Sequence, residues 1–267
     1  MAKKIGAIIP IRLKSERLPG KALMKICGKP VVCHLLDRLF ASKYLSMDNV
    51  VVCTTTDDSD DELVKVVEEY GAKVFRGSVD DIIKRFYDAI EAFQFDYVIQ
   101  VDGDDILTDT MYMDLTMQRL LSDDSLDIVL CEGLPLGIAS KSFTRTAMQR
   151  VNKHYKTINN DTGFTYYFTK TGLCKLSLVH PISPDHILNE ARLTLDYELD
   201  FEVFSKIFES LYVNGEVFGL AKVVSYLKKH PEVMNSNTSI NEEYWNRTRE
   251  KAQLYYTDFQ GQTKKIE

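Results

Sequence analysis

Four cations lie close together in a short polar segment near the start of the chain. This segment follows the apolar run Ile5–Pro10 and contains Arg12, Lys14, Arg17 and Lys21, with a Pro-Gly pair before the last of them. Arginine binds phosphate oxygens in pairs, lysine acts as a mobile point charge, and glycine lets a backbone approach its ligand closely. A solvated basic loop has the same composition, but the position after an apolar run favours a polyphosphate site. The segment matches neither the P-loop pattern nor the dinucleotide-binding glycine pattern.

Acidic residues are grouped at two other places in the chain. Asp102, Asp104 and Asp105 lie within four residues, and Asp196 and Asp200 lie within five. Carboxylate oxygens suit Mg²⁺, which binds one or two carboxylates together with phosphates and water. The alternatives are an Asp-Gly turn with solvated acids for the first group and a helix cap for the second. Three carboxylates in so short a stretch favour a metal site at the first group.

The elements that must position these residues alternate between apolar runs and amphipathic segments. Strands are predicted at residues 5–10, 50–53, 73–75, 97–101 and 192–195, and helices after 30, after 62, over about 80–93 and after 200. This alternation predicts βαβ units and a mainly parallel sheet, hence an α/β fold. Ligands of such sheets bind beyond the carboxyl ends of the strands. The basic segment and both acidic groups follow predicted strands, so we expect them to meet at one edge.

Two stretches of the chain show weaker patterns. Residues 132–190 alternate short apolar and polar runs, which predicts an inserted hairpin or a dimer arm over the site. Residues 249–267 are polar and are expected to form a fraying tail. The remaining chain predicts a single domain over residues 1–248.

Composition excludes several classes of protein. The net charge of −6 argues against a dedicated nucleic-acid binder, which usually carries a basic excess. The five cysteines are dispersed, so neither a disulfide framework nor a zinc site is indicated. A signal-peptide core and a membrane-length apolar run are both missing from the sequence. We therefore predict a cytoplasmic protein that binds neither nucleic acid nor membrane.

The basic segment resembles the opening of the cytidylyltransferases that make CMP-activated sugar acids. The resemblance lies in Arg12-x-x-Ser15-x-Arg17-Leu-Pro-Gly-Lys21-x-Leu23, which continues as Gly28-Lys29-Pro30. The CMP-KDO synthetases and the SpsF group of spore-coat polysaccharide proteins share this opening, and the pattern is most like that of the SpsF group. Weaker matches follow in the family's order at residues 51–56 and 75–78, at Asp80-Asp81 and at Arg85. The resemblance covers roughly residues 4–110, with one more patch at 192–200.

The resemblance implies a Rossmann-like three-layer nucleotidyltransferase fold, often dimeric, and Mg²⁺-dependent transfer of CMP from CTP with release of pyrophosphate. By position, Arg12 and Lys21 would stabilise the charge on the leaving pyrophosphate. Asp104 matches the family's metal-binding Asp, and Asp196 matches its second metal-associated Asp. Arg12, Lys21 and Asp104 are therefore the implied catalytic residues. The predicted nucleotide-binding residues are Pro10, Arg12, Ser15, Arg17, Lys21, Thr54, Thr55, Arg76, Ser78 and Asp102.

Some of these assignments keep alternatives. Asp102 stands where the CMP-KDO synthetases carry Gln, and Tyr197-Glu198 replaces the family's Thr-Pro after Asp196. Thr54 and Thr55 end a predicted strand, where they could meet a base or ribose or could equally satisfy turn hydrogen bonds.

The leading hypothesis is an enzyme that transfers CMP from CTP to a small acidic acceptor (a sugar acid, phosphonate or phosphate) and acts as a homodimer. A sugar-1-phosphate nucleotidyltransferase is the second hypothesis, but its family usually opens with a G-x-G-T-R loop that this chain lacks. A nucleotide-binding regulator without activity is the third. The intact Lys21, Asp104 and Asp196 count against it.

Overall fold

A seven-stranded mixed sheet forms the centre of the molecule. The computed structural model describes residues 3–267. The strand order is β5-β4-β1-β6-β8-β7-β9, with bounds β1 Ile5–Pro10, β4 Val50–Thr55, β5 Lys73–Gly77, β6 Tyr97–Gln100, β7 Ile128–Cys131, β8 Lys141–Thr144 and β9 Leu176–Val179. Strands β5, β4, β1 and β6 are parallel, β8 runs antiparallel to both of its neighbours, and β7 pairs with β9 in parallel. The predicted α/β fold with a mainly parallel sheet is confirmed.

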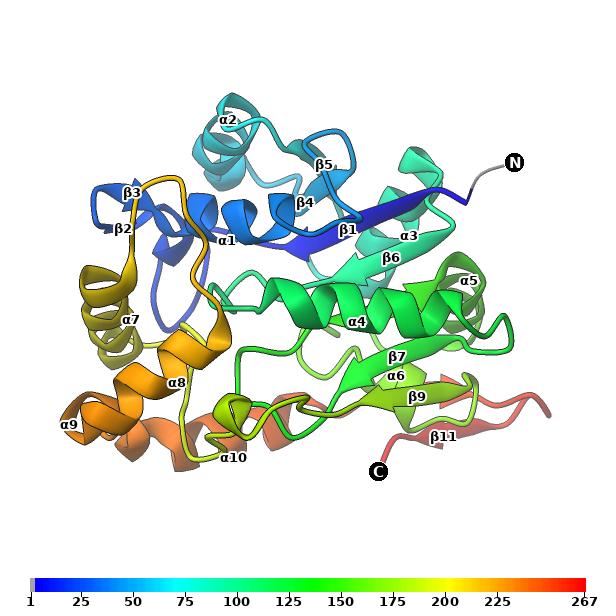
Figure 1. Cartoon of the computed structure of the whole chain (residues 1–267). Helices are drawn as coiled ribbons and strands as arrows, with labels where there is room; N and C mark the ends of the chain where they lie inside the picture. The colour runs from blue at the N-terminus through cyan, green and yellow to red at the C-terminus, as the bar shows by residue number, and fades with distance from the viewer. Residues whose placement is uncertain (1–2) are drawn as a thin grey trace.

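Helices cover both faces of this sheet and make three layers (Figure 1). The alternation of side chains along a strand explains the two cores. Ala7 and Ile9 of β1 join the core on one face of the sheet, whereas Ile8 joins the core on the other face. Because β1 and β4 are buried on both faces, they read as continuous apolar runs in the sequence.

Four of the helices in the described chain begin close to the positions predicted for helices, and the others were not predicted. Their bounds are α1 Val31–Phe40, α2 Asp61–Glu69, α3 Ile82–Phe93, α4 Thr110–Leu121, α5 Arg145–His154, α6 Tyr166–Thr169, α7 Glu198–Leu211, α8 Leu220–Lys229, α9 Pro231–Met234 and α10 Asn241–Lys251. Short 3₁₀ turns lie at Lys21–Leu23, Asp58–Asp60, Pro184–His186 and Thr238–Ile240, and β2 Lys25–Ile26 pairs with β3 Lys29–Pro30. Within residues 3–267, the structure holds no helix with the length and apolar character of a membrane span.

The strand predicted at 192–195 is wrong. Arg192 makes an isolated bridge to Leu136, and the rest of the segment is extended without a partner strand in the described chain. Its backbone pairs with two loops instead: Leu193 N donates to the Leu136 carbonyl at 2.9 Å, and Leu195 N donates to the Asp104 carbonyl at 2.9 Å. The segment is apolar because it is buried between these loops.

Residues 132–190 do not form an inserted arm. They supply β8 and β9 to the main sheet and α5 and α6 to one of its faces. The prediction failed because β8 carries polar side chains that are paired inside the protein. Ser142 shares a 2.9 Å hydrogen bond with Thr116, and Lys141 lies 2.7 Å from Asp102. Such a strand shows no apolar period.

The expected fraying of residues 249–267 is also wrong. Strands β10 Tyr255–Thr257 and β11 Thr263–Lys265 form an antiparallel hairpin. Leu254, Tyr256 and Ile266 are buried in the core under α3 and α5. Only a few apolar residues, spaced among polar ones, attach the hairpin, so its composition reads as a solvated tail.

Candidate active site

A cavity of about 460 Å³ lies at the carboxyl ends of β1 and β6. Pro10 and Arg12 line it after β1, and Asp102 and Asp104 line it after β6. Gly103 allows these two strand ends to approach, because a Cβ there would lie 2.4 Å from the Pro10 carbonyl oxygen. The predicted meeting of the basic segment with the first acidic group is therefore present at this edge of the sheet.

The basic segment is held in a fixed loop that places three of its four cations in the cavity. The loop is closed by hydrogen bonds from Ser15 N and Gly20 N to the Leu13 carbonyl at 2.8 and 2.9 Å, and Asp60 accepts a 2.7 Å hydrogen bond from Leu13 N. Arg12, Arg17 and Lys21 line the cavity together with Ser15. Lys14 points away and pairs with Asp57 at the surface, at 2.7 Å.

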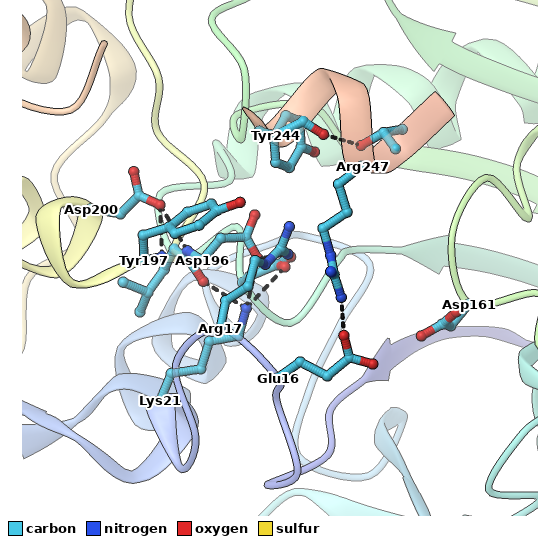
Figure 2. Close-up of polar contacts among 12 residues, drawn as sticks. Glu16, Arg17, Lys21, Asp161, Asp196, Tyr197, Asp200, Tyr244 and Arg247 are labelled. Atoms are coloured by element: carbon cyan, nitrogen blue, oxygen red, sulfur yellow. Dashed lines mark hydrogen bonds and ion pairs between the residues drawn. The ribbon is translucent and has the colours of Figure 1, made fainter. Parts of the chain in front are cut away.

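Lys21 joins the two acidic groups. Its Nζ lies 3.2 Å from Asp104 Oδ2 and 3.1 Å from Asp196 Oδ1, and it donates to the Leu195 carbonyl at 2.6 Å. Burial by itself lowers the pKa of Lys21, but the charges of Asp104 and Asp196 outweigh it and hold the pKa above its ordinary value. The Lys21 side chain is therefore an ammonium between two carboxylates. Figure 2 shows Lys21 beside Asp196.

A second cluster fixes the orientation of Asp196. Arg17 pairs with Asp196 Oδ1, and buried Arg192 approaches Asp196 Oδ2 at 3.3 Å. Arg192 also binds Asp200, with Nε 2.9 Å from Oδ1. Asp200 accepts hydrogen bonds from the backbone N of Asp196 and Tyr197 at 2.9 and 3.0 Å, so it caps the start of α7 (Figure 2). The helix-cap alternative therefore holds for Asp200, while the Asp196 carboxylate faces the cavity.

Asp102 belongs to a separate pair. Lys141 Nζ lies 2.7 Å from Asp102 Oδ2 and donates to Gln100 Oε1 at 2.9 Å. Lys141 is not among the predicted site residues, because only the antiparallel register of β6 and β8 sets it opposite Gln100. Burial lowers the Lys141 pKa, but the charge of Asp102 and its hydrogen bond leave that pKa raised.

Two further charged residues were left out of the predicted site. Asp161 pairs with Arg12 at 2.7 Å from a loop in which no motif was recognised. Arg85 of α3 is 4% exposed and lines the cavity. Its Nε and Nη1 have no hydrogen-bond partner among residues 3–267. Burial lowers the Arg85 pKa, and the two unpaired donors leave this guanidinium without a full set of protein acceptors beside the cavity. The match of Arg85 to the family pattern was the one indication in the sequence that it belongs to the site.

Four residues of the predicted nucleotide set lie elsewhere. In the described structure, Thr54, Thr55, Arg76 and Ser78 do not line the cavity, so their placement does not support the nucleotide role predicted for them. Thr55 donates to Asp60 at 2.5 Å, as the turn alternative expects. Arg76 Nε donates to the Thr55 carbonyl at 2.9 Å, and its guanidinium also pairs with Asp61 at 2.6 Å. Thr55 and Arg76 thus find their partners within this part of the chain, whereas Thr54 Oγ1 is buried with no hydrogen-bond partner among residues 3–267.

Helix α10 forms one wall of the cavity, and none of its residues was predicted to belong to the site. Tyr244, Trp245, Arg247 and Lys251 line the cavity from this helix. Its charged and aromatic side chains lie more than 40 positions beyond the last patch of family resemblance, and nothing in their spacing indicates a site.

Gly137 controls how closely the segment before Asp196 can pack. Its φ is +89°, and a Cβ at this position would lie 1.9 Å from the Leu193 carbonyl oxygen. We expect Gly137→Ala to lower the free energy of unfolding by more than about 2 kcal/mol, measured by urea unfolding, because the clash adds to the backbone strain. Gly172→Ala is the matched control, since Gly172 has φ +72° and open space around it. Equal losses in the two variants would show that the close approach carries no cost.

The donor set of the cavity fits a divalent cation only with help from a ligand. Among the residues described, no group of three or more His, Cys, Asp or Glu is arranged to hold a metal ion. Mg²⁺ does not require one, since it is usually bound by one or two carboxylates plus phosphates and water. Asp104 and Asp196 approach the same Lys21 ammonium, so a cation between them is compatible with this geometry. The arrangement suits a metal–polyphosphate complex.

Comparisons with known proteins identify a family and several relatives. The model of the cytidylyltransferase family matches residues 6–171. An uncharacterized protein of Methanocaldococcus jannaschii is 30% identical over 252 residues, which is 92% of this chain and 100% of that protein. The spore coat polysaccharide biosynthesis protein SpsF of Bacillus subtilis is 23% identical over 84% of this chain and 94% of its own length. The 3-deoxy-manno-octulosonate cytidylyltransferase of Yersinia pseudotuberculosis is 30% identical over 61% of each chain.

Solved structures share the fold. A cytidylyltransferase from Leptospira borgpetersenii superposes with a TM-score of 0.79 at 25% identity, over 87% of this chain and 97% of that one. A CMP:2-keto-3-deoxy-manno-octonic acid synthetase complexed with CTP superposes with a TM-score of 0.60 at 16% identity, over 78% of this chain and 99% of that one. Because the family model spans more than half of the sequence, this chain belongs to the cytidylyltransferase family.

Proposed function

We propose that the protein transfers CMP from CTP to a small acidic acceptor, with Mg²⁺ as cofactor and pyrophosphate as the second product. The observation that carries the proposal is the Lys21 ammonium between Asp104 and Asp196, in a cavity that also holds Arg12 and Arg17. Membership of the cytidylyltransferase family supports the reaction class. The fold shared with a synthetase that was solved with CTP supports the nucleotide.

The cations act on the leaving group in this proposal. An acceptor oxygen forms a bond to the α-phosphorus of CTP, and the bond from that phosphorus to the bridging oxygen of pyrophosphate breaks. The bonding electrons leave with pyrophosphate, so negative charge grows there. Arg12, Arg17 and Lys21 are already fixed by their loop, and preorganised cations stabilise such charge without reorganising.

Asp104 and Asp196 would hold the metal ion, and Mg²⁺ when bound would supply positive charge to the phosphate oxygens. Arg192 and Asp200 keep the Asp196 carboxylate turned toward the cavity. Lys21 pairs with both acids in the free protein, so it would share them with Mg²⁺ when the metal is bound.

The division of the chain and its assembly are further parts of the proposal. We assign the catalytic unit to a single domain that contains residues 1–248 together with the end of α10 at Lys251, which lines the cavity, and the hairpin that follows, which packs on the core. The homodimer implied by the resemblance is supported by Leu176 and Leu178, which are exposed on the edge strand β9.

Nucleotide selectivity tests the proposal directly. With Mg²⁺ present, CTP at about 100 times its Kd is expected to raise the Tm by about 5–10 °C, since ligand linkage stabilises the folded chain. ATP, GTP and UTP at the same concentration should raise it less. Equal shifts for all four nucleotides would contradict base selectivity. Pyrophosphate release from CTP with a panel of sugar acids, phosphonates and phosphorylated metabolites then identifies the acceptor.

A further inference from the structure

Helix α10 presents a set of side chains to the cavity that the triphosphate site does not use. None of the residues of α10 (Asn241–Lys251) is buried, yet Trp245, Arg247 and Lys251 line the cavity. Trp245 is 44% exposed, an unusual placement for the chain's single tryptophan. An exposed indole and two cations on one wall offer a flat apolar face beside positive charge.

The two cations of α10 are held by an internal carboxylate. Glu16, the one acid in the loop between Arg12 and Lys21, pairs with Arg247 (Figure 2). It also lies 3.0 Å from Lys251 Nζ. Hydrogen bonds from Lys251 and Arg247 hold the pKa of Glu16 below its usual range. The Glu16 side chain is 57% exposed, and exposed ion pairs are weak because water screens them. A carboxylate or phosphate on a ligand can therefore take the place of Glu16.

Aromatic contacts hold α10 against the basic segment, so its side chains have a defined position in the cavity wall. Tyr244 stacks on two guanidinium groups, with the Arg192 centre 4.3 Å and the Arg17 centre 5.7 Å from its ring. Trp245 packs edge-on against Tyr244, with ring centroids 5.1 Å apart. Arg17 and Arg192 both pair with Asp196, and both contact Tyr244 of the helix that carries Trp245 and Arg247. They thereby hold this helix beside Asp196.

We propose that α10 forms the acceptor subsite. Arg247 and Lys251 bind the acceptor's anionic group, a carboxylate or phosphate, and Trp245 packs against its sugar-like body. Glu16 occupies the anion position until the acceptor arrives. This inference rests on the proposed cytidylyl transfer and adds the class of acceptor and the residues that select it. The acceptor subsite thus lies on a helix near the end of the chain, on the cavity that residues of the 132–190 stretch also line.

The single tryptophan makes this subsite directly observable. Because Trp245 is the chain's one indole, its fluorescence reports binding at α10 without needing turnover. The purified full chain is saturated with CTP and Ca²⁺, which slows turnover while occupying the nucleotide site, and is titrated with gluconate, glucuronate, 3-deoxy-manno-octulosonate and glucose 6-phosphate. Glucose and mannose serve as neutral probes. We expect a saturable change in Trp245 fluorescence with at least one anionic probe and no change with the neutral sugars.

Variants on the same helix separate the subsite from general charge. Arg247→Ala and Lys251→Ala should each weaken binding of the anionic probe that gives a response by about tenfold. This is the scale of one hydrogen bond to a charged group. Arg249→Ala is the matched control, because Arg249 contacts Asn246 and does not line the cavity. Glu16→Gln removes the internal competitor, so it should strengthen probe binding by about threefold.

The outcomes distinguish this inference from the reaction itself. CTP affinity, measured separately by calorimetry, should stay unchanged in Arg247→Ala. A tenfold loss of CTP affinity in that variant would assign α10 to the triphosphate and overturn the subsite. Silence of the indole toward every anionic probe, or equal effects of Arg247→Ala and Arg249→Ala, would also overturn it. Failure of CTP to bind the unaltered protein would instead count against the proposed function.

Discussion

Replacing Lys21 with alanine is expected to lower the rate of pyrophosphate release by about 10²- to 10³-fold, the usual effect of removing one preorganised charge from a developing anion. Lys21 is the residue at which the two acidic segments and the basic loop meet, since its Nζ contacts both Asp104 and Asp196. Without it, the leaving pyrophosphate loses a cation. The two carboxylates also lose the charge that holds them together in the free protein.

The fold should survive this change. Asp196 keeps its contacts with Arg17 and Arg192, and Asp104, which loses its ion pair with Lys21, has a side chain that is 28% exposed to water. Circular dichroism and the urea midpoint show whether it does. Lys14→Ala is the matched control from the same loop, because Lys14 is at the surface and pairs with Asp57. Near-normal turnover by the Lys21 variant would remove this residue from the mechanism.

Asp104→Asn is expected to raise the Mg²⁺ concentration needed for half-maximal pyrophosphate release by at least tenfold, since even supporting contacts of metal ligands cost about 10- to 100-fold in metal affinity. The amide keeps the shape of the side chain but removes the charge that Mg²⁺ prefers. The measurement is a Mg²⁺ titration of initial rate at saturating CTP.

Asp102→Asn provides the comparison for this titration. Asp102 lies in the same turn but pairs with Lys141, 2.7 Å away, and not with Lys21. Its substitution should shift the Mg²⁺ requirement far less. An unchanged titration in Asp104→Asn, or equal shifts in both variants, would remove Asp104 as a specific ligand.

The parts of the site that could be predicted are those encoded within short segments. Arg12, Lys21 and Asp104 follow strands whose apolar runs are visible in the sequence, and parallel strands bring such ends together. The sheet was predictable for the same reason, because β1 and β4 are buried on both faces. Thr55 shows the limit of this rule. It also ends a strand, but Asp60, five positions later, accepts its hydroxyl and closes the turn.

The missed parts depend on contacts between distant segments. Lys141 reaches Asp102 through the pairing of β6 with β8, and strand β8 has no apolar period to reveal it. Arg247 reaches the cavity through a helix that buries no residue. A local pattern cannot show which loop such residues will face, since their position is set by the packing of other elements.

The bridge made by Lys21 also has a consequence in time. Lys21 and Asp196 are 175 positions apart in the chain. At a synthesis rate of about 5–20 residues per second, Asp196 is added roughly 9–35 seconds after Lys21. Throughout that interval the nascent chain carries the cations of the basic segment without Asp196, the last of their acidic partners to be made. Completion of the cavity is thus set by translation of the final third of the protein, long after its first strands can pair.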